Sequence, residues 1–188
     1  FRATPDPDRG IALAAITRDL SLAHLKAGAL RQLTIERVDP DLFLMSYDYV
    51  GDMAETISLI WPAPDGDADS ELPGLAAFVN DIETLPKSAL AGHVAALLDL
   101  ASPAERWAMI KLATGGLRVG VSARLAKTAL AAYSSRDLAE IEKIWHGLEI
   151  PYTGLFAWLD GTGPRPEIRH GQTSVSYTHL RAHETGWY

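Results

Sequence analysis

Apolar residues recur three and four positions apart along most of the chain, and the strict apolar–polar alternation of a surface strand is nearly absent. This spacing places apolar side chains on one face of a helix. The expected helices are short, the connections between them are short, and no internal repeat has a fixed period. The pattern therefore predicts an all-α fold, an irregular multi-helix bundle.

Capping residues predict where several helices begin. Ser102-Pro103-Ala104-Glu105 combines an N-cap, a first-turn proline and a capping glutamate, which predicts a helix from 103 to about 113. Asp39-Pro40 predicts another start, and Asp52 with Glu55 predicts a capping box that opens a helix over 53–61. Further helices are expected over 75–84, 87–100, 123–133, 136–146 and 153–160, with Gly147 and Gly161 at C-terminal caps.

Two other segments have a less regular pattern. Leu22, Leu25, Ala29, Leu30 and Leu33 form one apolar face after Ser21, which we interpret as an N-cap. Between Pro62 and Pro73 the chain is a loop with alternating acids, Asp65, Asp67, Asp69 and Glu71. These carboxylates could form a metal loop, but they lack the glycine and the distal glutamate of a calcium hand, so a solvated connection is favoured.

Composition narrows the class of protein. The 188 residues, 47% of them hydrophobic, suffice for one domain or for one domain and a fragment. The absence of cysteine excludes disulfides and thiolate metal sites. No apolar run approaches the ~20 residues of a membrane span, and no secretory signal is present. We therefore expect no membrane contact and a cytoplasmic protein whose true start precedes Phe1.

One stretch is positively charged although the net charge of the chain is -7. No Asp or Glu lies between Glu105 and Asp137, whereas this stretch contains six basic residues: Arg106, Lys111, Arg118, Arg124, Lys127 and Arg136. An acidic protein can still hold phosphate groups with a local patch of this kind. The stretch is thus the main candidate for binding a polyanion.

The centre of this basic stretch, from Thr114 to Ser122, is rich in glycine. Glycines allow close approach of the backbone to a ligand, and Ser122 can cap a helix whose N-terminus favours an anion. The guanidinium of Arg118 matches phosphate oxygens. No Gly-Lys-Ser/Thr follows the glycines, so this is not a Walker loop. An ordinary helical corner with solvated basic side chains remains the alternative.

Other blocks of distinctive sequence accompany the segment Lys111–Leu125 (KLATGGLRVGVSARL), namely Asp39–Phe43 (DPDLF), Ser46–Thr56 (SYDYVGDMAET), Ile144–Leu148 (IWHGL), Pro151-Tyr152 and Leu155–Leu159 (LFAWL). Together, and in this order, they resemble the N-terminal DNA-binding domain of bacterial ATP-dependent DNA ligases. The resemblance covers residues 1–168. It implies that the helical domain lies across the minor groove and contacts phosphates on both sides of a nick.

The resemblance also implies which residues contact DNA. The family's Gly-Leu-Arg-Ile-Gly-Val-Ser segment matches residues 116–122, with Val119 in place of isoleucine. The expected phosphate-facing residues are Lys111, Thr114, Gly116, Arg118, Gly120, Ser122, Arg124 and Lys127. The Gly51-Asp52 turn could also present a helix N-terminus to DNA, although simple capping is favoured. Trp145 and His146 are expected to be core and cap.

Departures from the family limit the function expected of this chain. A complete ligase carries a Lys-x-Asp-Gly motif. None of the lysines here is followed by x-Asp-Gly. The resemblance therefore implies a fragment without catalytic residues, whose parent binds ATP and Mg²⁺. Its partners would be nicked double-stranded DNA and the missing adenylation and oligonucleotide-binding domains. Residues 169–188 do not resemble the family and are expected to form an unrelated, poorly ordered tail, in which His179 and His183 lack a third metal ligand.

Two alternatives remain. The chain could be a non-catalytic, all-helical protein-interaction module that binds partners through its apolar and acidic faces. A stand-alone enzyme is disfavoured, because no nucleophile–base pair, carboxylate pair or metal cluster has convincing spacing. Convergence of the six basic side chains on one surface would favour DNA, and scatter would favour the interaction module.

Overall fold

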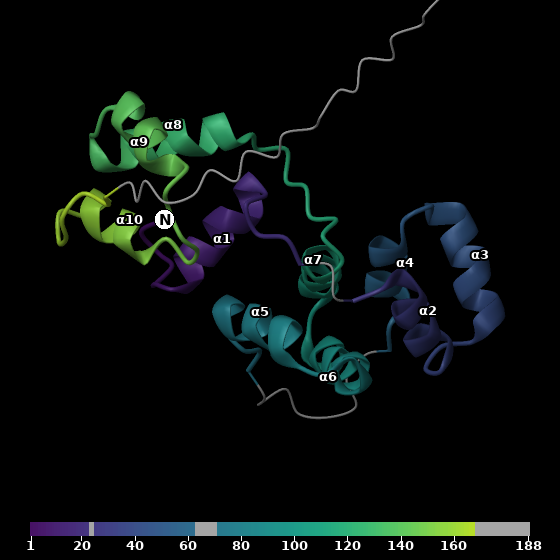
Figure 1. The fold of residues 1–188 in the computed structure, drawn as a ribbon. Helices are drawn as coiled ribbons and strands as arrows, with labels where there is room; N and C mark the ends of the chain where they lie inside the picture. Colours follow the sequence, from purple (N-terminus) through teal and green to yellow (C-terminus); the bar gives the residue numbers. More distant parts are fainter. Residues whose placement is uncertain (23–24, 63–70, 168–188) are drawn as a thin grey trace, which may run out of the picture.

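The computed structural model describes residues 1–22, 25–62 and 71–167, and these residues form ten α-helices and no strand (Figure 1). The predicted all-α class is therefore confirmed. The helices are α1 (Asp8–Thr17), α2 (Ala27–Ile35), α3 (Pro40–Val50), α4 (Met53–Ile60), α5 (Leu75–Thr84), α6 (Lys87–Leu100), α7 (Pro103–Ala113), α8 (Ala123–Ser134), α9 (Leu138–Trp145) and α10 (Thr153–Leu159).

Side-chain caps begin α3, α4 and α7 where the sequence placed them. At α7 the Ser102 hydroxyl accepts a hydrogen bond from the Glu105 N–H, and the Glu105 carboxylate accepts one from the Ser102 N–H. Asp39 caps α3, with Pro40 at the first helical position. Asp52 caps α4 by accepting from the Glu55 N–H, but among the described residues the Glu55 carboxylate does not accept from the Asp52 N–H, so only half of the predicted capping box forms. At the other end of a helix, Gly161 takes the left-handed conformation after α10, as a C-terminal glycine is expected to.

The prediction of an N-cap at Ser21 is wrong. Helix α2 begins at Ala27, and its N-cap is the extended residue Lys26. Leu22 and Leu25 are nevertheless buried, from the connection that precedes the helix. Their three-residue spacing is the same as that of residues on one face of a helix. Residues of a connection can have this spacing too when surrounding elements bury them.

Helix α1 was not expected from the sequence. Seven of its ten residues are buried and cover about two thirds of the circumference of the helix, whereas Asp8, Ala12 and Ile16 form one half-buried stripe. Because so much of the helix is buried, its residues do not show the narrow apolar stripe of a surface helix, and the sequence signal is weak.

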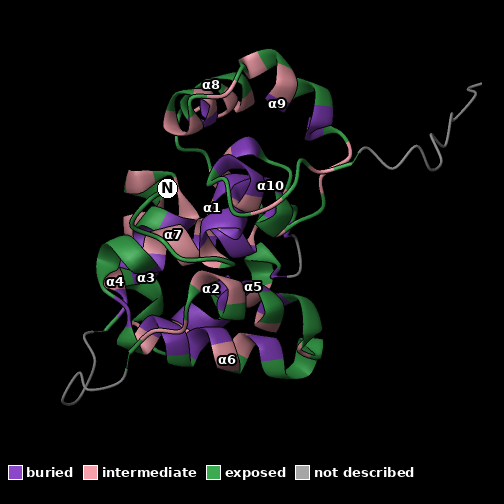
Figure 2. Ribbon diagram, turned by 90° about the vertical axis from the view of Figure 1, so that its left-hand side faces the viewer, coloured by how far each residue is buried: buried purple, intermediate pink, exposed green. Residues whose placement is uncertain are grey.

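Two hydrophobic clusters form the core, and α1 contributes to both. Ile11 and Ala15 pack into the cluster formed with α2–α7, whereas Leu13 and Ala14 pack into the cluster formed with α8–α10. Figures 1 and 2 show α1 between α8 on one side and α5 on the other, and Figure 2 colours most of it as buried. Helix α1 thus joins the two halves of the molecule.

Polar contacts secure α1 against α10. The Arg9 guanidinium donates to Asp160 at 2.9 Å and lies 4.0 Å from the centre of the Phe156 ring. At Gly10 a Cβ atom would lie 1.4 Å from the Pro151 carbonyl oxygen, so only glycine allows the backbones to approach this closely. The position of α1 matters for function because the chain leaves it at Arg18, beside the glycine-rich segment.

None of the described helices is long and apolar enough to cross a membrane. Most of the acidic loop, over residues 63–70, lies outside the described residues, as does the segment 168–188 with His179 and His183.

Candidate nucleic-acid interface

The glycine-rich segment begins as the C-terminal cap of α7. The Gly115 N–H donates to the Leu112 carbonyl at 3.1 Å and the Gly116 N–H donates to the Lys111 carbonyl at 2.8 Å, which is the Schellman pattern. Gly115 has φ +72°, and a Cβ atom there would lie 2.8 Å from the Leu22 carbonyl oxygen. The turn therefore packs directly on the connection between α1 and α2, and both glycine N–H groups are already used within the protein.

The same segment ends as the N-terminal cap of α8. The Ser122 hydroxyl accepts a hydrogen bond from the Leu125 N–H at 3.1 Å. Within the described part of the chain, the N–H groups of Ala123 and Arg124 have no hydrogen-bond acceptor. Gly120, two residues before the cap, is exposed and has φ +72°. The N-terminus of a 12-residue helix thus faces solvent, with a partial positive charge.

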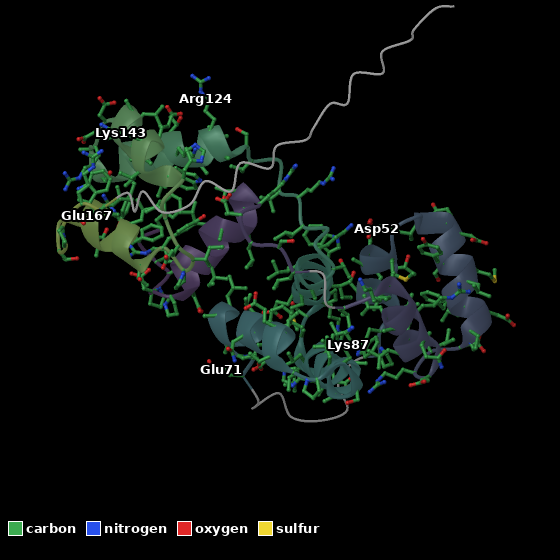
Figure 3. All side chains as sticks on the ribbon, in the orientation of Figure 1. Asp52, Glu71, Lys87, Arg124, Lys143 and Glu167 are labelled. Atoms are coloured by element: carbon green, nitrogen blue, oxygen red, sulfur yellow. The ribbon has the colours of Figure 1, made fainter. Side chains whose placement is uncertain are left out.

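Arg118 and Arg124 add full positive charges to this end of α8. Both side chains are exposed, and neither forms an ion pair with any residue that the structure describes. Figure 3 shows Arg124 projecting from α8 into solvent. Two arginines with free planar donors beside a helix N-terminus suit contacts with phosphate oxygens.

A third arginine, which no sequence pattern marks, lies beside them. Arg18 and Arg118 line one hollow of about 160 Å³, together with Ser21 and Gly115. Arg18 follows α1 in the left-handed conformation, with φ 67°. No sequence signal identified it, because 100 residues separate it from Arg118 and only the packing of Gly115 on the α1–α2 connection brings them together.

The neighbouring Asp19 is held away from this arginine hollow. Its carboxylate accepts hydrogen bonds from the Thr17 hydroxyl at 2.8 Å, the Tyr152 hydroxyl at 2.8 Å and the Trp145 indole N–H at 3.2 Å. Burial and the hydrogen bond to Asp19 raise the pKa of Tyr152. The Asp19 carboxylate thus binds to side chains near α9 and α10 and forms no ion pair with Arg18 among the described residues. From the sequence alone, the adjacent Arg18 and Asp19 would be expected to neutralise each other.

Other residues expected to face phosphate make contacts within the protein. Lys111 forms an ion pair with Asp52 of α4. Burial by itself raises the pKa of Asp52, but the hydrogen bonds from Lys111 and from the Glu55 N–H outweigh it and lower the pKa. The Lys127 ammonium lies 4.7 Å from the centre of the Trp145 ring. The Thr114 hydroxyl donates to the Ile110 carbonyl at 2.7 Å.

The six basic side chains between Arg106 and Arg136 do not all converge on one surface, because the two arginines at the ends of the stretch bind within the protein, and this outcome favours the interaction module. Arg106 is only 3% exposed, and its guanidinium donates to the carbonyl oxygens of Leu98, Trp61 and Pro62 at 2.8 to 3.0 Å. Arg136 donates to the Trp158 carbonyl and lies over the Trp158 ring. Both arginines therefore stabilise the packing of helices. The sequence could not show this, because an acid-free stretch does not reveal which of its faces is buried.

Two further expectations concern the surroundings of the interface. The Gly51-Asp52 turn acts as a cap: Gly51 has φ 75° at the end of α3, and Asp52 begins α4. Trp145 is buried and His146 is the C-cap of α9, as expected. Among the described residues, no group of three or more histidine or acidic side chains is placed to hold a metal ion.

Comparisons with protein-family models, with curated proteins and with solved structures gave no match to this chain.

Proposed function

We propose that this chain binds the sugar-phosphate backbone of duplex DNA, as the DNA-binding domain of a cytoplasmic ATP-dependent DNA ligase. The contact surface comprises Arg18, Arg118, Arg124 and the N-terminus of α8, and we call it the arginine surface. The observation that carries the proposal is that Arg18 and Arg118 line one hollow beside the glycine-rich segment. The sequence resemblance supports the ligase assignment, and the arginine surface supports a phosphate ligand.

The proposed mechanism is positioning. Arginine side chains and helix N–H groups contact phosphate oxygens of any sequence, so they fix the protein on the duplex without reading bases. The chain would hold a nicked duplex while adenylation and oligonucleotide-binding domains of the parent enzyme, with ATP and Mg²⁺, carry out sealing. In this proposal the chain itself contributes no catalytic residue.

Binding of fluorescent nicked duplexes of several sequences tests this function. Arg18→Gln, Arg118→Gln and Arg124→Gln should each weaken binding about tenfold, because each removes a charge-assisted hydrogen bond to phosphate. The loss should be the same for every sequence. Lys87→Gln is the matched control, since Figure 3 shows Lys87 and Arg124 on opposite sides of the molecule. Equal losses for the control and the arginine variants, or a loss confined to one sequence, would contradict backbone binding.

One observation favours the interaction module as a second candidate. The exposed side chains of Leu42, Met45 and Tyr49 lie on one face of α3 at positions i, i+3 and i+7, and they are 51%, 72% and 93% exposed. Asp41 and Asp48 border this stripe, are exposed, and form no ion pair with a described residue. An apolar stripe beside an acidic row suits a basic amphipathic helix of a partner protein.

A helical peptide of alternating leucine and lysine faces is the probe for this second function. Met45→Gln and Tyr49→Gln should weaken binding of the peptide about tenfold, because each removes apolar area from the stripe. Leu59→Gln is the control, since Leu59 is 64% exposed but lies on α4. If the control weakens binding as much as the α3 variants do, the stripe is not the docking surface.

A further inference from the structure

An apolar pocket of about 330 Å³ opens between α1, α5 and α7. Its lining includes Ala12 and Ala15 of α1, Phe78 of α5, and Met109 and Leu112 of α7. Among the described residues that line it, Glu105 is the one that carries a charge. The pocket is partly open to solvent, and its volume is about twice that of the apolar cavity of roughly 150 Å³ that suffices to bind benzene. A pocket of this size and character therefore suits an apolar group.

The apolar pocket adjoins the hollow that contains two arginines. Ala15, Leu112 and Leu117 line both spaces. Arg18 and Arg118 occur only in the second, so the two spaces together form a site with an apolar body and a cationic end. Because the shared residues belong to two segments of the chain, α1 and the end of α7 with the turn that follows it, the junction is a product of the fold rather than of one turn.

The two ends of the site carry opposite charges. Along α7, Glu105 precedes Leu112 by seven residues, which corresponds to ~10 Å of helix. Along α1, the lining likewise runs from Ala12 to Arg18. Hydrogen bonds from Ser102 lower the pKa of Glu105 and keep its carboxylate ionised. An anionic group is therefore repelled from the Glu105 end and attracted to the arginine end.

We propose that this composite site binds one free anionic amphiphile, an alkyl chain that carries a terminal carboxylate or phosphate. The chain lies in the apolar pocket, and the head group accepts hydrogen bonds from Arg18 and Arg118. Burial of the chain supplies the binding free energy, and the guanidinium groups fix its orientation. This site goes beyond the proposed DNA contact and does not depend on it.

Calorimetric titration with decanoate, below the concentration at which it forms micelles, tests the proposal without DNA. We expect one decanoate per chain, and binding about tenfold weaker to decanol, which lacks the charge. Acetate, which lacks the chain, should not bind measurably. Arg18→Gln and Arg118→Gln should each weaken decanoate binding about tenfold, whereas Arg124→Gln, outside the lining, should leave it unchanged.

A pocket-filling variant tests the position of the chain. Ala108→Phe places a ring in the apolar lining and should abolish decanoate binding. Ala104→Phe on the same helix is the control, because Ala104 is exposed and outside the lining. The arginine variants remain a test even if Ala108→Phe does not fold.

Three results would overturn the proposal. The first is equal affinity for decanol and decanoate, which would remove the role of the arginines. The second is unchanged decanoate binding in the Arg18 and Arg118 variants. The third is association with phosphatidylglycerol vesicles alone and none with monomeric decanoate, which would indicate a membrane surface rather than a free ligand.

Discussion

Arg106 and Arg118 lie twelve positions apart in one basic stretch and occupy opposite environments. The Arg106 guanidinium is enclosed and donates to three backbone carbonyls, and burial lowers its pKa despite the nearby Asp99. Arg118 is exposed beside Arg18. Residue type and local charge are the same in both cases, so the difference comes entirely from the packing of α7 against the rest of the molecule.

Replacement of Arg106 should destabilise the fold. In Arg106→Met the carbonyl oxygens of Leu98, Trp61 and Pro62 lose a donor, the first two in buried hydrogen bonds and the third in a partly buried one, and we expect the free energy of unfolding to fall by about 3 kcal/mol. Urea denaturation measures this change. Arg124→Met, at an exposed position, should shift it by less than about 0.5 kcal/mol. If Arg106→Met lowers the free energy of unfolding no more than Arg124→Met does, the hydrogen bonds of Arg106 contribute little to stability.

The Asp52–Lys111 ion pair should make stability depend on acidity. The pKa of folded Asp52 is lowered, so its contribution is full above the unfolded value of 3.8 and is lost as pH falls through the folded pKa. Asp52→Ser keeps an acceptor for the helix cap but removes the charge. Acid unfolding followed by circular dichroism should show less loss of stability below about pH 4 in this variant. Identical acid profiles would contradict the ion pair.

At the scale of helices, the residues at the helix ends predicted the bounds of several elements. The bounds of α5, α6 and α7 agree with those expected, because proline, glycine and capping side chains mark their ends. Helix α1 is buried around most of its circumference, which weakens its amphipathic pattern, and the start of α2 was misplaced because Leu22 is buried from a connection. Arg18 was missed for the same reason as α1, since its role depends on contacts between distant segments.

The turn after α7 gives a test at this scale. Gly115→Ala should cost more than about 1 kcal/mol, because the residue has φ +72° and a methyl group would meet the Leu22 carbonyl. Gly92→Ala is the matched control: Gly92 lies within α6 with open space around it, and alanine should stabilise by up to about 1 kcal/mol. Thermal unfolding compares the two, and equal effects would exclude the role given to Gly115.

At the scale of the whole molecule, α1 should make the two clusters unfold together. Leu13 is fully buried in the cluster with α8–α10, while Ile11 on the same helix packs into the other cluster. Leu13→Ala should lower stability by about 2 to 5 kcal/mol and keep one transition in both tryptophan fluorescence and circular dichroism. Leu59→Ala, at an exposed position, is the control. Two separate transitions in the parent chain would mean that α1 does not couple the clusters.

The arginine surface is also a property of the whole molecule, since it joins residues after α1 to residues around the start of α8. Its most direct test is the salt dependence of binding to a nicked duplex. Three arginine–phosphate contacts predict that log affinity falls with log salt at a slope of about -2.7, or about -4.5 if Lys111 and Lys127 also contact phosphates. The triple variant Arg18→Gln, Arg118→Gln, Arg124→Gln should reduce the steepness by about 2.7. A parent chain whose binding is insensitive to salt, or a triple variant with the parental slope, would contradict the account.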